Sequence, residues 1–140
     1  MKKQVMLSIL GRQVYMDQEP DTIELVTEGT MEFVDGGWNI RYQETELTGL
    51  AGVTTTFRVE PGKVILTRTG GLTSEMVFQE GVRHESLYQM DFGALLITVC
   101  APRIFAQIGD EGGMVDLVYS IDIEHNTAGT VDYHLEITPK

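Results

Sequence analysis

The sequence predicts an all-β protein, a single antiparallel up-and-down β-barrel of about 8–10 strands. Two observations support this fold class. Apolar and polar residues alternate with a period of two along much of the chain, and groups of turn-forming residues recur about every ten residues. Because consecutive strands with short links must hide their edges, a closed barrel is favoured over a sandwich, which hides them only in part.

The alternation begins near the N-terminus, at Val5, Leu7 and Ile9. This apolar run is too short for a signal peptide and no small-residue cleavage site follows it, so we expect it to form the first strand. Later segments also have one apolar and one more polar phase, as in strands with one buried and one wet face. In chain order these segments are residues 23–25, 31–33, 38–44, 53–59, 115–123 and 131–137.

Turn signals separate the alternating segments. They are Asp-Gly-Gly at 35–37, Glu-Pro-Gly at 60–62, Gly-Gly at 70–71, Glu-Gly-Gly at 111–113 and Asn-Thr-Ala-Gly at 126–129. Residues 101–111 are the least regular, and a short helix is the alternative to a strand there. Pro102 has no backbone N–H to donate, which predicts a bulge, a bend or an edge strand. No linker or repeat interrupts the chain, so we expect one β-barrel domain over residues 1–140.

Composition and charge exclude several partners. Hydrophobic residues make up 42% and charged residues 22% of the chain, as in soluble globular proteins. The net charge of -11 repels phosphate groups, so nucleic acid and membrane surfaces are not expected as partners. No apolar run approaches the roughly 20 residues of a membrane-spanning helix, and a cytoplasmic location is expected. The lone cysteine, Cys100, excludes an internal disulfide, and we expect it to be a small buried residue.

Known catalytic and cofactor motifs do not occur in the sequence. Glycine-rich phosphate loops, the nucleophile elbow and paired-cysteine or HExxH metal motifs are all missing. The three histidines, His84, His125 and His134, are dispersed along the chain, which does not favour a zinc site. We therefore expect no cofactor and no metal.

Strand phase places several polar residues inside the predicted barrel. Arg68 is in phase with the apolar residues that precede it in its strand, and Tyr42 and Glu44 are in phase with the apolar residues of theirs. In a later strand, His84 and Tyr88 share the drier phase. Because a buried arginine without a partner is very costly, Glu44 is expected to form a bidentate pair with Arg68.

Two interpretations of this polar group remain open. Arg68 and Glu44 could form a structural pair near a mouth of the barrel, or Arg68 could extend past the strand end towards solvent. Alternatively, Arg68 anchors the anionic head of a ligand inside the barrel, and Tyr42, Glu44, His84 and Tyr88 orient it. A slip of one residue in the predicted phase would turn the whole group outward.

These residues lead to three functional hypotheses. The first is a non-enzymatic barrel that binds a small apolar or anionic ligand, and therefore has no catalytic residues. The second is an isomerase- or cyclase-type enzyme in which His84 or Glu44 is the general base and Arg68 stabilises negative charge. The third is a structural or interaction module, a monomer or a homodimer, whose outward apolar residues form an interface. Those outward residues are Ile65, Leu87, Ile97 and Val99.

Three stretches together resemble the YwiB-like family of small bacterial proteins, whose function is unknown. They are RYQETEL at 41–47, VILTRTGGLTSEMVFQEG at 64–81 and YQMDFGALLITV at 88–99. The resemblance runs from Trp38 to Val99 and continues more loosely to the last strand. It implies a calycin (lipocalin)-like β-barrel and brings no assigned activity or catalytic residue. Ligand binding of the lipocalin kind would be an analogy from the fold alone.

Overall fold

A computed structural model describes residues 2–15, 19–44, 52–70, 74–90, 93–124 and 126–140, and for residues 15, 87–90 and 127 only the backbone is described. All regular structure in these residues is β-strand. The strands are β1 (Lys3–Tyr15), β2 (Asp21–Val34), β3 (Gly37–Gln43), β4 (Thr54–Glu60), β5 (Lys63–Thr69), β6 (Ser74–Gln79), β7 (Arg83–Met90), β8 (Gly93–Gly109), β9 (Gly112–Ile123) and β10 (Asn126–Pro139).

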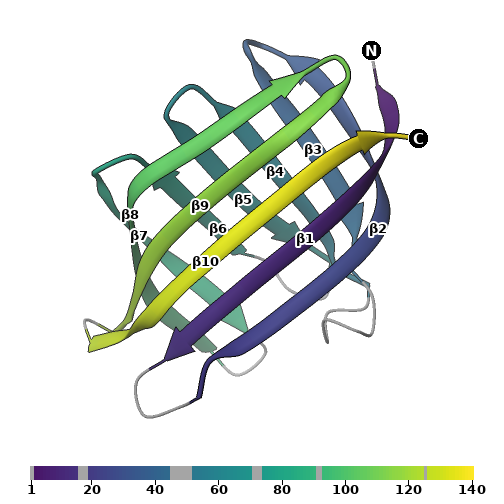
Figure 1. Ribbon diagram of the computed structural model, residues 1–140. Helices are drawn as coiled ribbons and strands as arrows, with labels where there is room; N and C mark the ends of the chain where they lie inside the picture. The colour runs from purple at the N-terminus through teal and green to yellow at the C-terminus, as the bar shows by residue number, and fades with distance from the viewer. Residues whose placement is uncertain (1, 16–18, 45–51, 71–73, 91–92, 125) are drawn as a thin grey trace.

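The strands form one antiparallel sheet that curves into a nearly closed barrel (Figure 1). The strand order is β6-β5-β4-β3-β2-β1-β10-β9-β8-β7. Strands that are consecutive in the chain pair with each other except β6 and β7, which lie at the two edges of the sheet, and β1 pairs with β10. Between β6 and β7, the described residues form one isolated bridge, Gln79 to Val82. The predicted up-and-down barrel is confirmed, at the upper end of the expected number of strands.

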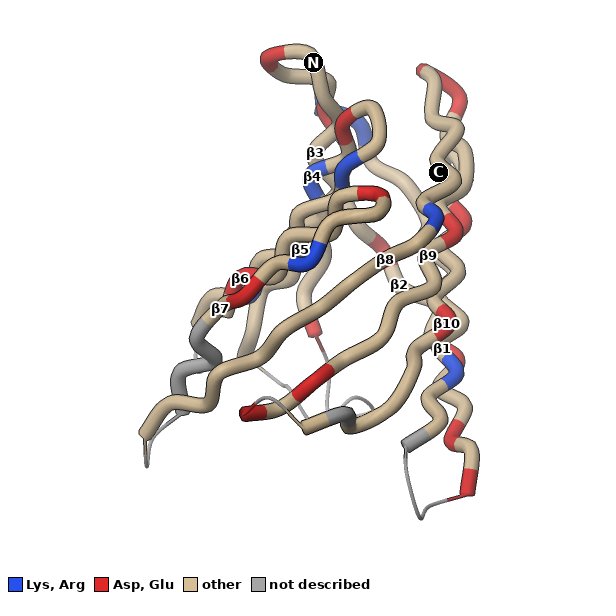
Figure 2. The backbone as a smooth tube through the Cα atoms, turned by 90° about the vertical axis from the view of Figure 1, so that its left-hand side faces the viewer, with Lys and Arg blue, Asp and Glu red and all other residues tan. Residues whose placement is uncertain are grey.

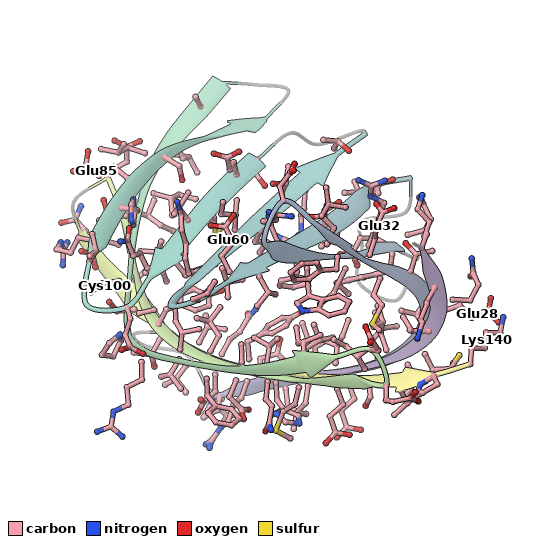
Figure 3. All side chains as sticks on the ribbon, turned by 90° about the horizontal axis from the view of Figure 1, so that it is seen from above. Glu28, Glu32, Glu60, Glu85, Cys100 and Lys140 are labelled. Carbon is pink, nitrogen blue, oxygen red and sulfur yellow. The ribbon has the colours of Figure 1, made fainter. Side chains whose placement is uncertain are left out.

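Alternating side chains fill the interior. Figure 3, which looks down on the barrel from above, shows side chains of facing walls in the space between them. In β4, buried residues alternate with half-buried residues along the whole strand, as the period of two predicts. The largest fully buried side chains come from most of the strands: Val5, Leu7, Met31, Ile40, Phe57, Val64, Phe78, Val99, Val115 and Leu135.

Charged side chains follow the turns and the outer faces of the strands. Figure 2 shows aspartate and glutamate at turns of both ends of the barrel and along the strands between them. At the rim, Nζ of Lys140 lies 2.6 Å from Oε1 of Glu28, and both residues are labelled side by side in Figure 3. Among the described acidic residues, all except the buried Glu44 are half-buried or exposed.

The turns predicted at residues 35–37, 60–62 and 111–113 are present, and the one predicted at 70–71 lies partly outside the described residues. Asp35 and Gly36, with φ of 52° and 81°, form the turn of the β2–β3 hairpin, and two consecutive positive φ angles match the twist of the strands. The turn predicted at residues 126–129 is wrong, because β10 already begins at Asn126 and shifts register between Thr127 and Gly129. The small residues there accommodate a β-bulge rather than a chain reversal.

The irregular segment at residues 101–111 belongs to β8, so the helical alternative is wrong. The register of β8 against β9 shifts between Cys100 and Arg103, which agrees with a bulge, one of the three features that Pro102 predicts. Oε2 of Glu80 accepts a hydrogen bond of 3.0 Å from the backbone N–H of Ile104, and the backbone N–H of Gly81 donates one of 2.9 Å to the carbonyl oxygen of Ala101. The turn between β6 and β7 is thereby attached to the bulge.

Two residues that were expected to face outward are buried instead. Ile97 and Val99 have 5% and 1% exposure and belong to the core. Both phases of this stretch are apolar, so the alternation did not say which phase faces inward. Cys100, on the other phase, is half-buried rather than buried. The predicted outward apolar set therefore loses two members, and the side chain of a third, Leu87, lies outside the described residues.

Candidate functional site

Strand register aligns a row of polar side chains on the inner face of the barrel. Tyr42 in β3 lies opposite Thr55 in β4, which in turn lies opposite Arg68 in β5. The row continues to Ser74 in β6. Directly opposed residues of antiparallel strands share a face, and Tyr42, Thr55 and Ser74 are all buried. The register thus carries the guanidinium of Arg68 inward.

Glu44 lies at the end of β3 beside this row. Its backbone N–H donates a hydrogen bond of 2.8 Å to the carbonyl oxygen of Val53, which extends the β3–β4 pairing by one residue. The carboxylate is 2% exposed, and its Oε2 accepts a hydrogen bond of 2.5 Å from the hydroxyl of Thr55. Nε of Arg68 lies 3.9 Å from the same oxygen. The expected ion pair is present, but as one long contact rather than the bidentate pair.

Two tyrosines from opposite walls extend the polar group. Tyr42, in β3, interacts with Glu44, and Tyr133, in β10, interacts with Tyr42. Burial, followed by the negative charge of Glu44, raises the pKa of Tyr42 to about 12. Burial also holds the pKa of Tyr133 well above its usual range, with Tyr42 as the next cause. Both hydroxyls therefore keep their protons near neutral pH.

A cavity of about 340 Å³ opens beside this group. This volume is near the lower end of the roughly 300–1,000 Å³ of small-molecule sites. Its polar lining includes Tyr42, Glu44, Arg68 and Tyr133. Its apolar lining includes Ile9, Leu25, Leu66, Met76, Ile121 and Val131. The interior is therefore not completely filled by side chains, and the space that remains has an apolar wall and a polar end.

Three of the five predicted site residues meet at this cavity, namely Tyr42, Glu44 and Arg68. His84 does not line it, so His84 and Arg68 do not share this cavity. His84 follows the β6–β7 turn, where its Nε2 lies 3.2 Å from Oε1 of Gln79, whereas Arg68 pairs with the opposite end of β6. Strand phase predicts the face of a residue and not its height in the barrel. The side chain of Tyr88 lies outside the described residues.

The structure adds two residues that the sequence did not single out. Thr55 shares its phase with the core residue Phe57, so its inward direction could be read from the sequence, but its contact with Glu44 could not. Tyr133 also follows an apolar phase. Its contact with Tyr42 joins β3 to β10 across the interior, and Tyr133 lies opposite Gly11, which has no side chain to occupy the space beside the ring.

His134 lies on the outer face of β10, as its phase predicts, and has a separate role. Its ring nitrogens contact Asp116 and Glu136, and these hydrogen bonds, that of Asp116 first, raise the pKa of His134. The contacts stabilise the fold fully below the unfolded-state pKa of about 6.5, and this contribution is lost as the pH rises through the folded-state pKa.

A substitution of His134 tests this linkage. We expect His134→Gln to lower the free energy of unfolding more at mildly acidic pH than at alkaline pH, because only the charged ring gains from the two carboxylates. Urea unfolding of the wild type and the variant at a series of pH values measures the difference. A difference that is constant with pH, or that grows as the pH rises, would contradict this origin of the shift.

The fold and the cavity place the protein among antiparallel β-barrels with a small, partly polar interior space. Within the described residues, no helix is long and apolar enough to cross a membrane, and no group of three or more potential metal ligands occurs.

The chain belongs to a family described as a domain of unknown function, DUF1934, whose model matches residues 7–137. A solved structure, the crystal structure of the ywiB protein from Bacillus subtilis, is similar over 96% of this chain and 92% of that chain, with a TM-score of 0.80 and 21% sequence identity. This confirms the resemblance inferred from the sequence, and at this identity it supports the fold alone. No curated protein matches the chain.

Proposed function

We propose that the protein is a non-enzymatic, calycin-like barrel that binds a small, partly apolar molecule in its cavity, with a hydrogen-bond-accepting head on Arg68. One observation carries the proposal. Arg68 lines the cavity, and its Nε is buried and has no hydrogen-bond partner within the described part of the chain. A ligand oxygen at this position would accept the hydrogen bond that Nε can donate.

The energetics of burial support this assignment. A buried donor without an acceptor costs about 1–3 kcal/mol, and a bound acceptor recovers that cost. The long contact of 3.9 Å between Nε and Glu44 balances charge without providing a hydrogen bond. The apolar wall, which includes Leu25, Ile121 and Val131, fits the remainder of the ligand.

The same geometry favours binding over isomerase or cyclase chemistry. Glu44, one candidate base, accepts a hydrogen bond from Thr55 and lies 3.9 Å from Nε of Arg68, so its carboxylate is already engaged with groups of the protein. The other candidate base, His84, does not line the cavity. The tyrosine hydroxyls hold their protons, so they serve as donors that orient the polar end of the site.

A pair of arginine variants tests the proposal. Octanamide serves as the probe because it has an apolar chain and a neutral acceptor. We expect it to perturb amide resonances of cavity residues in a two-dimensional NMR titration, and Arg68→Met to weaken binding about tenfold or more. Arg41→Met is the matched control, because Arg41 is exposed on β3 and contacts Thr56 on the outer face.

A cavity-filling variant tests whether octanamide binds in the cavity rather than on the outer surface of the barrel. Val131 is 3% exposed and lines the cavity, so Val131→Phe is expected to abolish octanamide binding while the fold is retained. Equal affinities of the wild type and Arg68→Met, or perturbations confined to the outer face, would overturn the proposal. So would the lack of any binding up to the solubility limit of the probe.

A further inference from the structure

The cavity already balances its own charge. Among the described residues that line it, Arg68 is the only basic one and Glu44 the only acidic one. The other titratable side chains that face the cavity are the tyrosines Tyr42, Tyr119 and Tyr133, from β3, β9 and β10. Tyr42 and Tyr133 are neutral near neutral pH because burial raises the pKa of each. Within the described residues, the cavity is therefore lined by one positive and one negative side chain.

We propose that the cavity selects electroneutral ligands: partly apolar molecules whose head is a neutral hydrogen-bond acceptor, such as an amide, an ester or a protonated carboxylic acid. This inference rests on the proposed function and specifies the class of ligand. It departs from the expectation that a buried arginine signals an anionic head. Arg68 supplies a hydrogen-bond donor, and Glu44 has already compensated its charge.

The burial of Glu44 disfavours an anionic ligand. Its carboxylate is 2% exposed and lies 3.9 Å from Nε of Arg68, so solvent screens it little. An anionic head on Arg68 would lie close to this carboxylate and leave a net negative charge in the barrel, which is strongly unfavourable. A neutral acceptor accepts the hydrogen bond from Nε of Arg68 and leaves the net charge of the cavity unchanged. The net charge of -11 on the whole chain also repels anions before they reach the cavity.

A carboxylic acid should therefore enter together with one proton. The carboxylate takes a proton from solvent to form its O–H bond, no electrons are transferred, and the carbonyl oxygen accepts the hydrogen bond from Arg68. Above the pKa of the acid, its observed affinity then falls about tenfold for each unit of pH. A neutral amide of the same chain length should show no such dependence.

Octanoate and octanamide test this proton uptake directly in the wild-type protein. Calorimetric titrations from about pH 6 to about pH 8 should show octanoate affinity falling about a hundredfold while octanamide affinity stays constant. Repeating them in buffers of different ionisation enthalpy should show one proton taken up with octanoate and none with octanamide. The amide also controls for protonation elsewhere in the protein, including His134 on the outer face.

Glu44→Gln is expected to reverse the preference of the cavity for octanamide over octanoate. Without the carboxylate, the charge of Arg68 is no longer compensated, so octanoate should bind as the anion, more tightly than octanamide and with no dependence on pH. The wild-type comparison decides the proposal if this variant does not fold. Octanoate that binds the wild type equally well at both ends of the pH range, or more tightly than octanamide at neutral pH, would overturn it. If neither compound binds, the proposed function itself fails.

Discussion

Replacing Phe57 with alanine is expected to lower the free energy of unfolding by about 3–5 kcal/mol. Phe57 is 2% exposed and lies between the two tyrosines of the polar group. Its ring is stacked with that of Tyr42, with centroids 6.4 Å apart and an interplanar angle of 18°, and its centroid lies 5.4 Å from that of Tyr133. The truncation removes buried apolar surface and leaves a void between β4 and β10, which rigid strands fill only in part.

Urea or thermal unfolding monitored by circular dichroism measures this loss. Phe105→Ala is the matched control, because Phe105 is 52% exposed on β8 and its removal should cost about 0.5 kcal/mol or less. Phe57→Ala should also weaken octanamide binding, since Phe57 holds both tyrosine rings in place. A loss as small as that of the control would mean that the two walls do not depend on this ring for their packing.

The sequence predicted the barrel because two independent signals agreed. The period of two set the direction of the side chains, and glycine-rich turns set the strand lengths, so strands such as β4 and β9 could be recognised without any long-range information. The prediction was wrong where one signal was missing. Ile97 and Val99 lie in a stretch whose two phases are both apolar, and only the pairing of β8 with β9 determines which phase faces the core.

The candidate site was predictable in part for the same reason. Tyr42, Glu44 and Arg68 are polar residues on an apolar phase, which is a signal that one strand can carry by itself. The contact of Tyr133 with Tyr42 depends on how the sheet curves to bring β10 opposite β3, and no local pattern encodes this curvature. His84 was predicted to share the site because its strand phase is the drier one. Its half-buried side chain instead lies at a different height from Arg68 in the barrel.

Breaking the Glu44–Arg68 pair is the second change with a large expected effect. Arg68→Met should lower the free energy of unfolding by about 3 kcal/mol, because it leaves the carboxylate of Glu44 buried without its countercharge. Glu44→Gln should also be destabilising, since it removes the charge that Arg68 faces. The double variant should cost less than the sum of the two single variants, by about 1–3 kcal/mol, because neither charge then remains to be compensated.

Measuring both stability and octanamide binding for the two single variants and the double variant separates two roles of Arg68, pairing with Glu44 and donating a hydrogen bond to the ligand. The double variant should recover much of the stability that Arg68→Met loses, but it should not recover octanamide affinity, because the donor at Nε is still missing. Recovery of both would mean that Arg68 supports the cavity only through its pairing with Glu44. Strict additivity of the two stability losses would mean that the contact of 3.9 Å carries no coupling and that the charge balance inferred for the cavity does not hold.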